Sequence, residues 1–176
     1  MNLTETKLAI ANGSFDNGFE LLYGEAKASK ERYAAAVDKF MSIYHGAQDV
    51  RLFSAPGRTE IGGNHTDHQH GCVLAGSVNL DVIAVVAINE DNKIRIKSEG
   101  YDMDVVDISE LEKRDNEKGK AIALIRGVCS RFKEMGISLK GFNAYTTSNV
   151  LKGSGLSSSA AFEVLIGTIL NGLFAE

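Results

Sequence analysis

The chain has 176 residues, of which 44% are hydrophobic and 24% are charged, a composition that is typical of one ordinary globular domain and argues against disorder. The net charge of -4 gives no reason to expect a nucleic acid partner, because proteins that bind phosphate backbones usually carry a clustered basic surface. The N-terminus lacks the layout of a signal peptide, and no apolar run reaches the roughly 18 residues of a membrane span. We therefore expect a cytoplasmic protein without a membrane partner.

Residues 4–46 are predicted to be helical. Good helix formers are frequent there, and apolar side chains between Tyr33 and Tyr44 recur at spacings of three and four residues, which makes one apolar face. Glycines at 13, 18 and 24 divide the earlier part into short helices or turns. We assign residues 1–48 to a helical N-terminal extension.

From residue 50 the pattern changes to that of strands joined by turns. The first predicted strand ends at Pro56, the only proline in the chain, and a later β-branched stretch has a break near residues 79–81. The order of strand, turn and strand favours an antiparallel sheet. The predicted strands cover residues 51–55, 73–88 in one or two pieces, 93–97, 105–108 and 142–147.

Two more amphipathic helices are predicted, over residues 121–135 and from about residue 158 to residue 174. Strands and helices together indicate an α+β fold with one layer of sheet and one of helices. The last helix has a strong apolar face close to the end of the chain, so we expect a partner surface there. That surface would belong either to sequence absent from this chain, such as a C-terminal domain, or to a second copy.

A loop of small residues, 152–161, runs directly into the last predicted helix. Gly153 and Gly155 allow the backbone to turn and to approach a ligand closely, and serines follow where a helix presents unpaired N–H groups. The partial positive charge of a helix start attracts phosphate, and a serine hydroxyl can reach a bound magnesium ion. The alternative is a loop that only caps a buried helix.

Residues 153–161 resemble the second motif of the GHMP kinases, the superfamily of galactokinase, homoserine kinase and mevalonate kinase, in which it is usually written Pro-x-Gly-x-Gly-Leu-Ser-Ser-Ser-Ala-Ala. Leu151 stands where the family usually has proline. The resemblance implies that the loop binds the β and γ phosphates of ATP and that Ser159 is a ligand of Mg²⁺. The implied nucleotide-binding residues are Gly153, Ser154, Gly155, Leu156, Ser157, Ser158 and Ser159.

A second polar stretch, residues 57–71, follows the first predicted strand and is dense in hydrogen-bonding groups. Its histidines could suggest a metal site, but their spacing fits no standard zinc pattern. Sugar recognition is the better interpretation, because Asn64 and Asp67 can accept from hydroxyls, His65 can donate or accept, and Arg58 gives fixed donors.

This stretch resembles the galactokinase signature, usually Ala-Pro-Gly-Arg-Val-Asn-Leu-Ile-Gly-Glu-His-Thr-Asp-Tyr. The positions that match are Arg58, Gly63, His65, Thr66 and Asp67. By the family pattern, Arg58 stabilises the transition state beside the transferred phosphoryl group, and residues 64, 65 and 67 bind sugar hydroxyls. The chain departs from the pattern at Glu60, Gly62, Asn64 and His68, and Asn64 replaces the family's sugar-binding glutamate, which leaves the identity of the sugar open.

The two motifs occur in the family's order, so the resemblance covers roughly residues 50–176. It implies a fold like domain 2 of ribosomal protein S5, with a mainly antiparallel sheet packed on helices, and it makes residues 49–176 a GHMP kinase N-terminal domain that holds both the galactose-binding signature and the phosphate loop. The implied activity is that of a galactokinase-type phosphotransferase in galactose metabolism, which uses ATP and Mg²⁺ to phosphorylate the anomeric hydroxyl of galactose.

In that family the catalytic base, a glutamate that completes the magnesium site and a third motif follow the point at which this chain ends. We therefore expect this N-terminal part, without a C-terminal domain, to be inactive alone. Two alternatives stay open: a non-catalytic sensor that binds galactose and ATP, and a GHMP kinase for a related sugar such as N-acetylgalactosamine.

Overall fold

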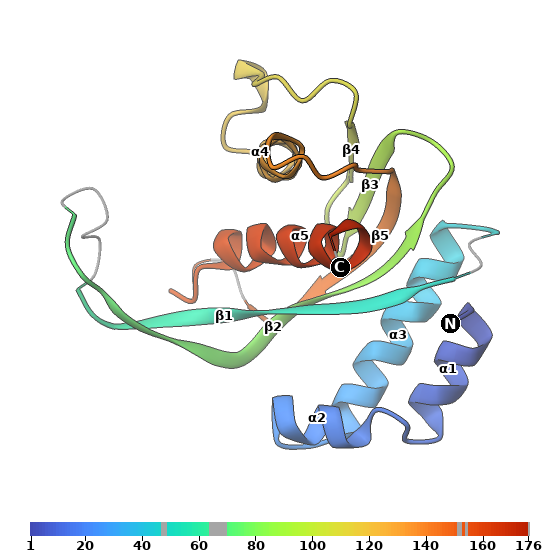
Figure 1. Cartoon of the computed structure of the whole chain (residues 1–176). Helices are drawn as coiled ribbons and strands as arrows, with labels where there is room; N and C mark the ends of the chain where they lie inside the picture. Colours follow the sequence, from blue (N-terminus) through green and yellow to red (C-terminus); the bar gives the residue numbers. More distant parts are fainter. Residues whose placement is uncertain (47–48, 64–69, 151–152, 154, 176) are drawn as a thin grey trace.

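A single mixed sheet runs through the computed structural model, which describes residues 1–46, 49–63, 70–150, 153 and 155–175 (Figure 1). Within these residues the strand order is β1-β2-β5-β3-β4. All neighbouring strands are antiparallel except β3 and β5, which are parallel, so the predicted antiparallel sheet is confirmed apart from that pair. The strands are β1 (Arg51–Gly62), β2 (Leu74–Ile88), β3 (Lys93–Ser98), β4 (Met103–Asp107) and β5 (Phe142–Ser148).

Helices cover both faces of this sheet, which corrects the prediction of one layer of helices. The N-terminal helices lie on one side and the last two helices on the other, as Figure 1 shows. Within the described residues the helices are α1 (Leu3–Ala11), α2 (Asp16–Tyr23), α3 (Lys27–Ile43), α4 (Ala121–Glu134) and α5 (Ser158–Phe174), together with the 3-10 turn η2 (Asp115–Glu117).

The reason for this arrangement lies in β2, whose residues 82–87 are all buried. Successive side chains of a strand point to opposite faces, so a run without polar alternation must be covered on both sides. Ile83 and Val85 contact a cluster with Phe40 of α3, whereas Val82 and Ala84 contact a second cluster built on α4 and α5. The apolar run in the sequence thus carried the information that the one-layer prediction overlooked.

The N-terminal helices belong to the hydrophobic core on their side of the sheet. Val37 and Phe40 are fully buried against β2 and β5. Gly13 and Gly24 lie between helices with positive φ, as predicted, but Gly18 lies inside α2 instead of ending a helix. The predicted domain boundary between residues 48 and 49 stays a prediction.

Strands β1 and β2 extend beyond the sheet as a two-stranded ribbon, which we define as residues 58–62 paired with residues 74–77. The pairing shifts where the ribbon begins: Pro56 faces Asp81, but Arg58 faces Ser77, so three residues of β2 bulge opposite one of β1. The break predicted near residues 79–81 is therefore an irregularity inside one long strand. It gives the ribbon a direction of its own.

Candidate functional site

The small-residue loop reaches α5 through three left-handed backbone positions. Gly153 and Gly155 have φ values of 81° and 78°, and a Cβ atom at either would meet nothing within 4 Å. These glycines are needed for the backbone conformation and not for space. Ser157, which directly precedes α5, has φ 56° and ψ 57°, a conformation that costs a non-glycine residue about 1 kcal/mol.

The Ser157 side chain does not cap α5, although its position before the helix suggested that role. Its hydroxyl instead accepts a hydrogen bond of 3.3 Å from Nε of Arg58, which lies 99 residues earlier in the chain. The backbone N–H of Arg58 also donates to the carbonyl of Leu156 at 3.2 Å. Arg58, from the polar stretch of residues 57–71, is thus in direct contact with the loop that precedes α5.

Gly57 makes this close approach possible. A Cβ atom there would lie 3.2 Å from the Leu156 carbonyl oxygen and 3.1 Å from a methyl group of Val150. Such distances are tighter than ordinary van der Waals contact, so a side chain at position 57 would push β1 away from the loop. The Pro-Gly-Arg sequence therefore serves both as a bend in β1 and as a contact surface for the loop that precedes α5.

Glu60 is a partner of Arg58 that the motif comparison had noted only as a departure. One guanidinium nitrogen donates to Oε1 of Glu60 at 2.7 Å, and the Arg58 side chain is 50% exposed. The signal was present in the sequence, because residues 58 and 60 of one strand share a face of the sheet. Glu60 and Ser157 together hold the guanidinium group from two sides.

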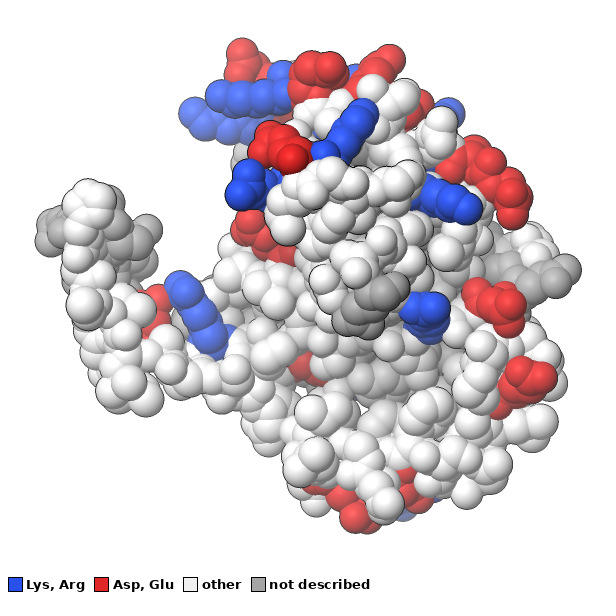
Figure 2. Space-filling view, viewed as in Figure 1, with Lys and Arg blue, Asp and Glu red and all other residues white. Residues whose placement is uncertain are grey.

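The predicted sugar-binding residues Asn64, His65 and Asp67 lie outside the described residues, as does Ser154 of the phosphate loop. The structure does place both ends of the predicted sugar loop. Gly62 pairs with Leu74, and a Cβ atom at Gly63 would lie 2.3 Å from the carbonyl oxygen of Cys72. The loop therefore starts and ends at the tip of the ribbon, which protrudes from the body of the molecule on the left of Figure 2.

The first turn of α5 provides the groups that a phosphate needs. The first N–H groups of any helix lack an intrahelical partner and carry partial positive charge. Ser158 is half-buried and Ser159 is exposed in this turn, so both hydroxyls lie beside those N–H groups. The loop and helix start therefore suit a phosphate group. Among the residues that the structure describes, no cluster of three or more His, Cys, Asp or Glu could hold a metal ion by itself.

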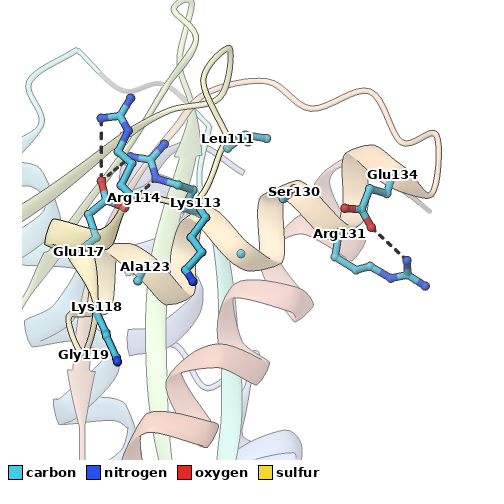
Figure 3. Close-up of a pocket in the computed structure, with 12 residues that line it drawn as sticks. Leu111, Lys113, Arg114, Glu117, Lys118, Gly119, Ala123, Ser130, Arg131 and Glu134 are labelled. Atoms are coloured by element: carbon cyan, nitrogen blue, oxygen red, sulfur yellow. Dashed lines mark hydrogen bonds and ion pairs between the residues drawn. The ribbon is translucent and has the colours of Figure 1, made fainter.

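A separate pocket of about 450 Å³ lies between η2 and α4, and the two motifs contribute none of its lining. Figure 3 shows the ion pair of Glu117 with Arg114 and, further along α4, the ion pair of Arg131 with Glu134. Buried Arg126 donates to both oxygens of Glu117 at 2.7 Å, which lowers the pKa of that carboxyl. The charges of this pocket are largely paired with one another, and its lining includes neither Arg58 nor Ser157.

Comparison with known proteins agrees with both motifs. Residues 38–88 match the family profile described as the galactokinase galactose-binding signature, and residues 123–176 match the profile of the GHMP kinases N terminal domain. Mevalonate kinase from Methanococcus jannaschii shares the fold at 15% identity, with a TM-score of 0.56 over 73% of this chain and 41% of that one. The fold and the motif together place the chain among the GHMP kinases.

Curated relatives narrow this class. Galactokinases from Lacticaseibacillus casei and Lactococcus lactis subsp. lactis are 36% and 32% identical over 78% and 80% of this chain. The crystal structure of Lactococcus lactis galactokinase complexed with galactose matches 81% of this chain and 37% of its own, with 30% identity and a TM-score of 0.72. The chain corresponds to the N-terminal portion of the galactokinases. It spans 36% of the length of these two curated relatives.

Within the part of the chain that the structure describes, no helix is long and apolar enough to cross a membrane.

Proposed function

We propose that this chain supplies the sugar-side and phosphate-side contacts of a galactokinase, which transfers the γ-phosphoryl group of ATP to the anomeric hydroxyl of galactose. The observation that carries the proposal is the 3.3 Å contact between Arg58 and Ser157, which joins the two motifs across 99 residues. Phosphoryl transfer depends mainly on positioning and on the neutralisation of charge. A cation that is held beside a phosphate-binding loop meets both needs.

Arg58 is the proposed transition-state stabiliser. Its guanidinium is half exposed, so it can reach a substrate, and Glu60 and Ser157 restrain its orientation. A restrained donor needs little reorganisation when negative charge develops on a transferred phosphoryl group. The arginine fork also matches phosphate oxygens better than an ammonium group does.

Residues 153–159 are the proposed phosphate cradle. The left-handed turns at Gly153 and Gly155 leave the backbone open, and the start of α5 adds N–H donors. Ser159, which is exposed in the first turn, is the proposed ligand of magnesium. A bound magnesium ion would supply charge neutralisation at the β and γ phosphates.

Asn64, His65 and Asp67 are proposed to bind sugar hydroxyls in the loop at the tip of the ribbon. An asparagine amide both donates and accepts, whereas the family's glutamate is a charged acceptor, so residue 64 tunes the choice of sugar. Galactose is the first candidate, because the galactose-binding signature matches residues 38–88. A related sugar such as N-acetylgalactosamine is the second, because residue 64 departs from the signature.

We propose no catalytic base within this chain. The base is expected from a further domain, which would cover the apolar surface of the ribbon and of α5. Ile61, Leu74 and Val164 are 70%, 63% and 54% exposed on these two elements. Exposed apolar groups on neighbouring elements are typical of an interaction surface. The chain alone is therefore expected to bind ligands without turnover.

The first test is calorimetric titration of the folded chain with MgATP, with galactose, and with glucose as the control sugar. Saturable binding of MgATP and of galactose, with weaker binding of glucose, supports the proposal. Absence of both interactions in a chain whose circular dichroism shows it to be folded overturns it.

The second test completes the active site with the remaining part of the Lactococcus lactis galactokinase, supplied as a separate polypeptide. Galactose-dependent formation of ADP is expected only when both parts are present. Arg58→Lys should lower that rate by about 100-fold to 1,000-fold, because the cation stays but the restrained fork is lost. Thr59→Ala, at the next exposed position of the ribbon, is the matched control. Binding of both ligands without any turnover would favour the sensor.

A further inference from the structure

A buried carboxylate on β2 connects the N-terminal helices to the strand that carries Arg58. Asp81 is only 2% exposed, and its side chain accepts hydrogen bonds of 2.5 Å from Arg32 of α3, Tyr23 of α2 and Ser54 of β1. Burial and the hydrogen bond to Asp81 raise the pKa of Tyr23, so its hydroxyl stays a donor at neutral pH. Donors from three elements thus converge on one charge that the solvent hardly reaches.

The same group holds both strands that lead to the functional site. Asp81 faces Pro56 across the ladder, at the position where the pairing of β1 shifts. Its carbonyl accepts the N–H of Asn149, and Arg32 donates to that carbonyl at 3.1 Å and to the carbonyl of Thr147 at 3.3 Å. The Arg32–Asp81 pair therefore fixes the bend of β1 relative to the end of β5.

The site begins one residue beyond each of these fixed points. Gly57 follows Pro56 and lies against Val150, which follows Asn149. Arg58 then donates its N–H to Leu156 and its Nε–H to Ser157. A continuous path of hydrogen bonds and close contacts runs from the buried pair to the arginine and the phosphate loop.

We propose that Asp81, held by Arg32, is a positioning residue that sets the place of Arg58 against the phosphate loop. This inference rests on the proposed function for its relevance to catalysis, but its geometric content stands apart from it. A buried charge whose partner is removed becomes costly, so the pair has one favourable arrangement. The N-terminal helices thereby act on the site through β1, although none of the described contacts joins them to Arg58 directly.

Amide hydrogen exchange on the full chain tests the geometry without any ligand. Asp81→Asn should accelerate exchange of the Arg58 amide about tenfold relative to the amides of β3, because coupling through a contact network is of that size. Asp16→Asn is the matched control, since Asp16 pairs with Lys30 in the same helical layer but lies outside the Asp81 cluster. Equal acceleration in the two variants would overturn the proposal.

Ser54→Ala is the milder variant if Asp81→Asn does not fold, because it removes one donor and leaves the ion pair in place. It should accelerate the Arg58 amide by a smaller factor in the same direction. If the exchange rate of the Arg58 amide does not change relative to the amides of β3, the proposal is contradicted.

Affinity for MgATP provides a second readout that a merely structural role would not move. Under conditions in which the unaltered chain and the variant are both fully folded, Asp81→Asn should weaken the binding of MgATP about fivefold. In an Arg58→Ala background it should have no further effect, because the path ends at Arg58. Additive losses would show that Asp81 does not act through Arg58. If the unaltered chain binds neither MgATP nor galactose, the proposed function fails, and the exchange experiment alone decides the positioning role.

Discussion

The paired strands β1 and β2 have two ends that lie in different environments. At one end, residues 82–87 of β2 are buried under helices on both faces. At the other end, the ribbon is exposed on both faces, with Ile61 and Leu74 largely in solvent. An isolated two-stranded hairpin is only marginally stable in water, so the ribbon depends on its attachment to the packed end.

One pair of strands thus contains both a segment of the packed core and a segment that carries part of the candidate site. The packed end is held by apolar burial and is expected to tolerate little change in volume. The ribbon carries Arg58 and leads to the predicted sugar loop, and its backbone geometry is set by the bulge and by a few close contacts. Substitutions at the two ends should therefore differ in size and in kind.

The largest loss is expected in the packed core. Phe40→Ala in α3 removes a fully buried ring that packs against the sheet, and it should lower the free energy of unfolding by about 3–5 kcal/mol. Urea denaturation measures the change. Met41→Ala, one residue further and 38% exposed, is the control and should change stability much less. Similar losses for both would show that α3 does not bury the face described.

The second effect concerns a charged pair in the packed part of the molecule. The bond from Arg126 lowers the pKa of Glu117 below its ordinary value of 4.5, so the unfolded chain binds more protons than the folded chain in acid. The stability from this pair is fully present above about pH 4.5 and is lost as the pH falls through the folded pKa.

Unfolding free energies between neutral pH and pH 3 should therefore fall more steeply for the unaltered chain than for Glu117→Gln. Glu60→Gln, which removes the carboxylate partner of Arg58 on the ribbon, should leave the slope nearly unchanged. A slope for Glu117→Gln that equals that of the unaltered chain would show that the pair is not formed in solution.

The third effect is local to the ribbon. Gly63→Ala forces a side chain into a backbone conformation with φ 85°, where its Cβ atom would lie 2.3 Å from the Cys72 carbonyl oxygen. The left-handed conformation alone costs about 1–2 kcal/mol. Exchange of the ribbon amides should accelerate while that of β3 stays constant. Gly62→Ala, where a Cβ atom meets nothing within 4 Å, is the control.

The smallest effect is expected at the exposed apolar positions of the ribbon. Leu74→Ala should change the free energy of unfolding by less than about 0.5 kcal/mol, because the side chain is 63% exposed. Val82→Ala in the same strand, 4% exposed, should cost several times more. A large loss for Leu74→Ala would mean that the ribbon is covered in solution, for example by a second copy of the chain.

Local patterns were sufficient for most of the elements. The predicted helix from about residue 158 to residue 174 agrees with α5, and the predicted strand 93–97 agrees with β3 to within one residue, because amphipathic periodicity and glycine stops are local signals. The layer prediction was wrong, because burial of both faces of β2 depends on which helices return to the sheet. That is a property of the chain as a whole.

The candidate site divides in the same way. Both motifs could be recognised from their residue types, and Arg58 was predicted as a site residue from its sequence context. The roles proposed for Asn64, His65 and Asp67 stay predictions. The restraint of Arg58 by Glu60 and the convergence on Asp81 were not anticipated, because the three donors to that carboxylate lie between 27 and 58 residues away along the chain.

The sequence by itself determined most of the helices and strands, and it predicted a phosphate loop and a sugar-binding stretch, because these depend on neighbouring side chains and on backbone preferences. Only the tertiary structure decided that Arg58 meets Ser157, that Gly57 lets β1 approach the loop, and that Asp81 ties the N-terminal helices to that strand. Contacts between distant residues depend on the closure of the sheet, and no local pattern encodes that closure.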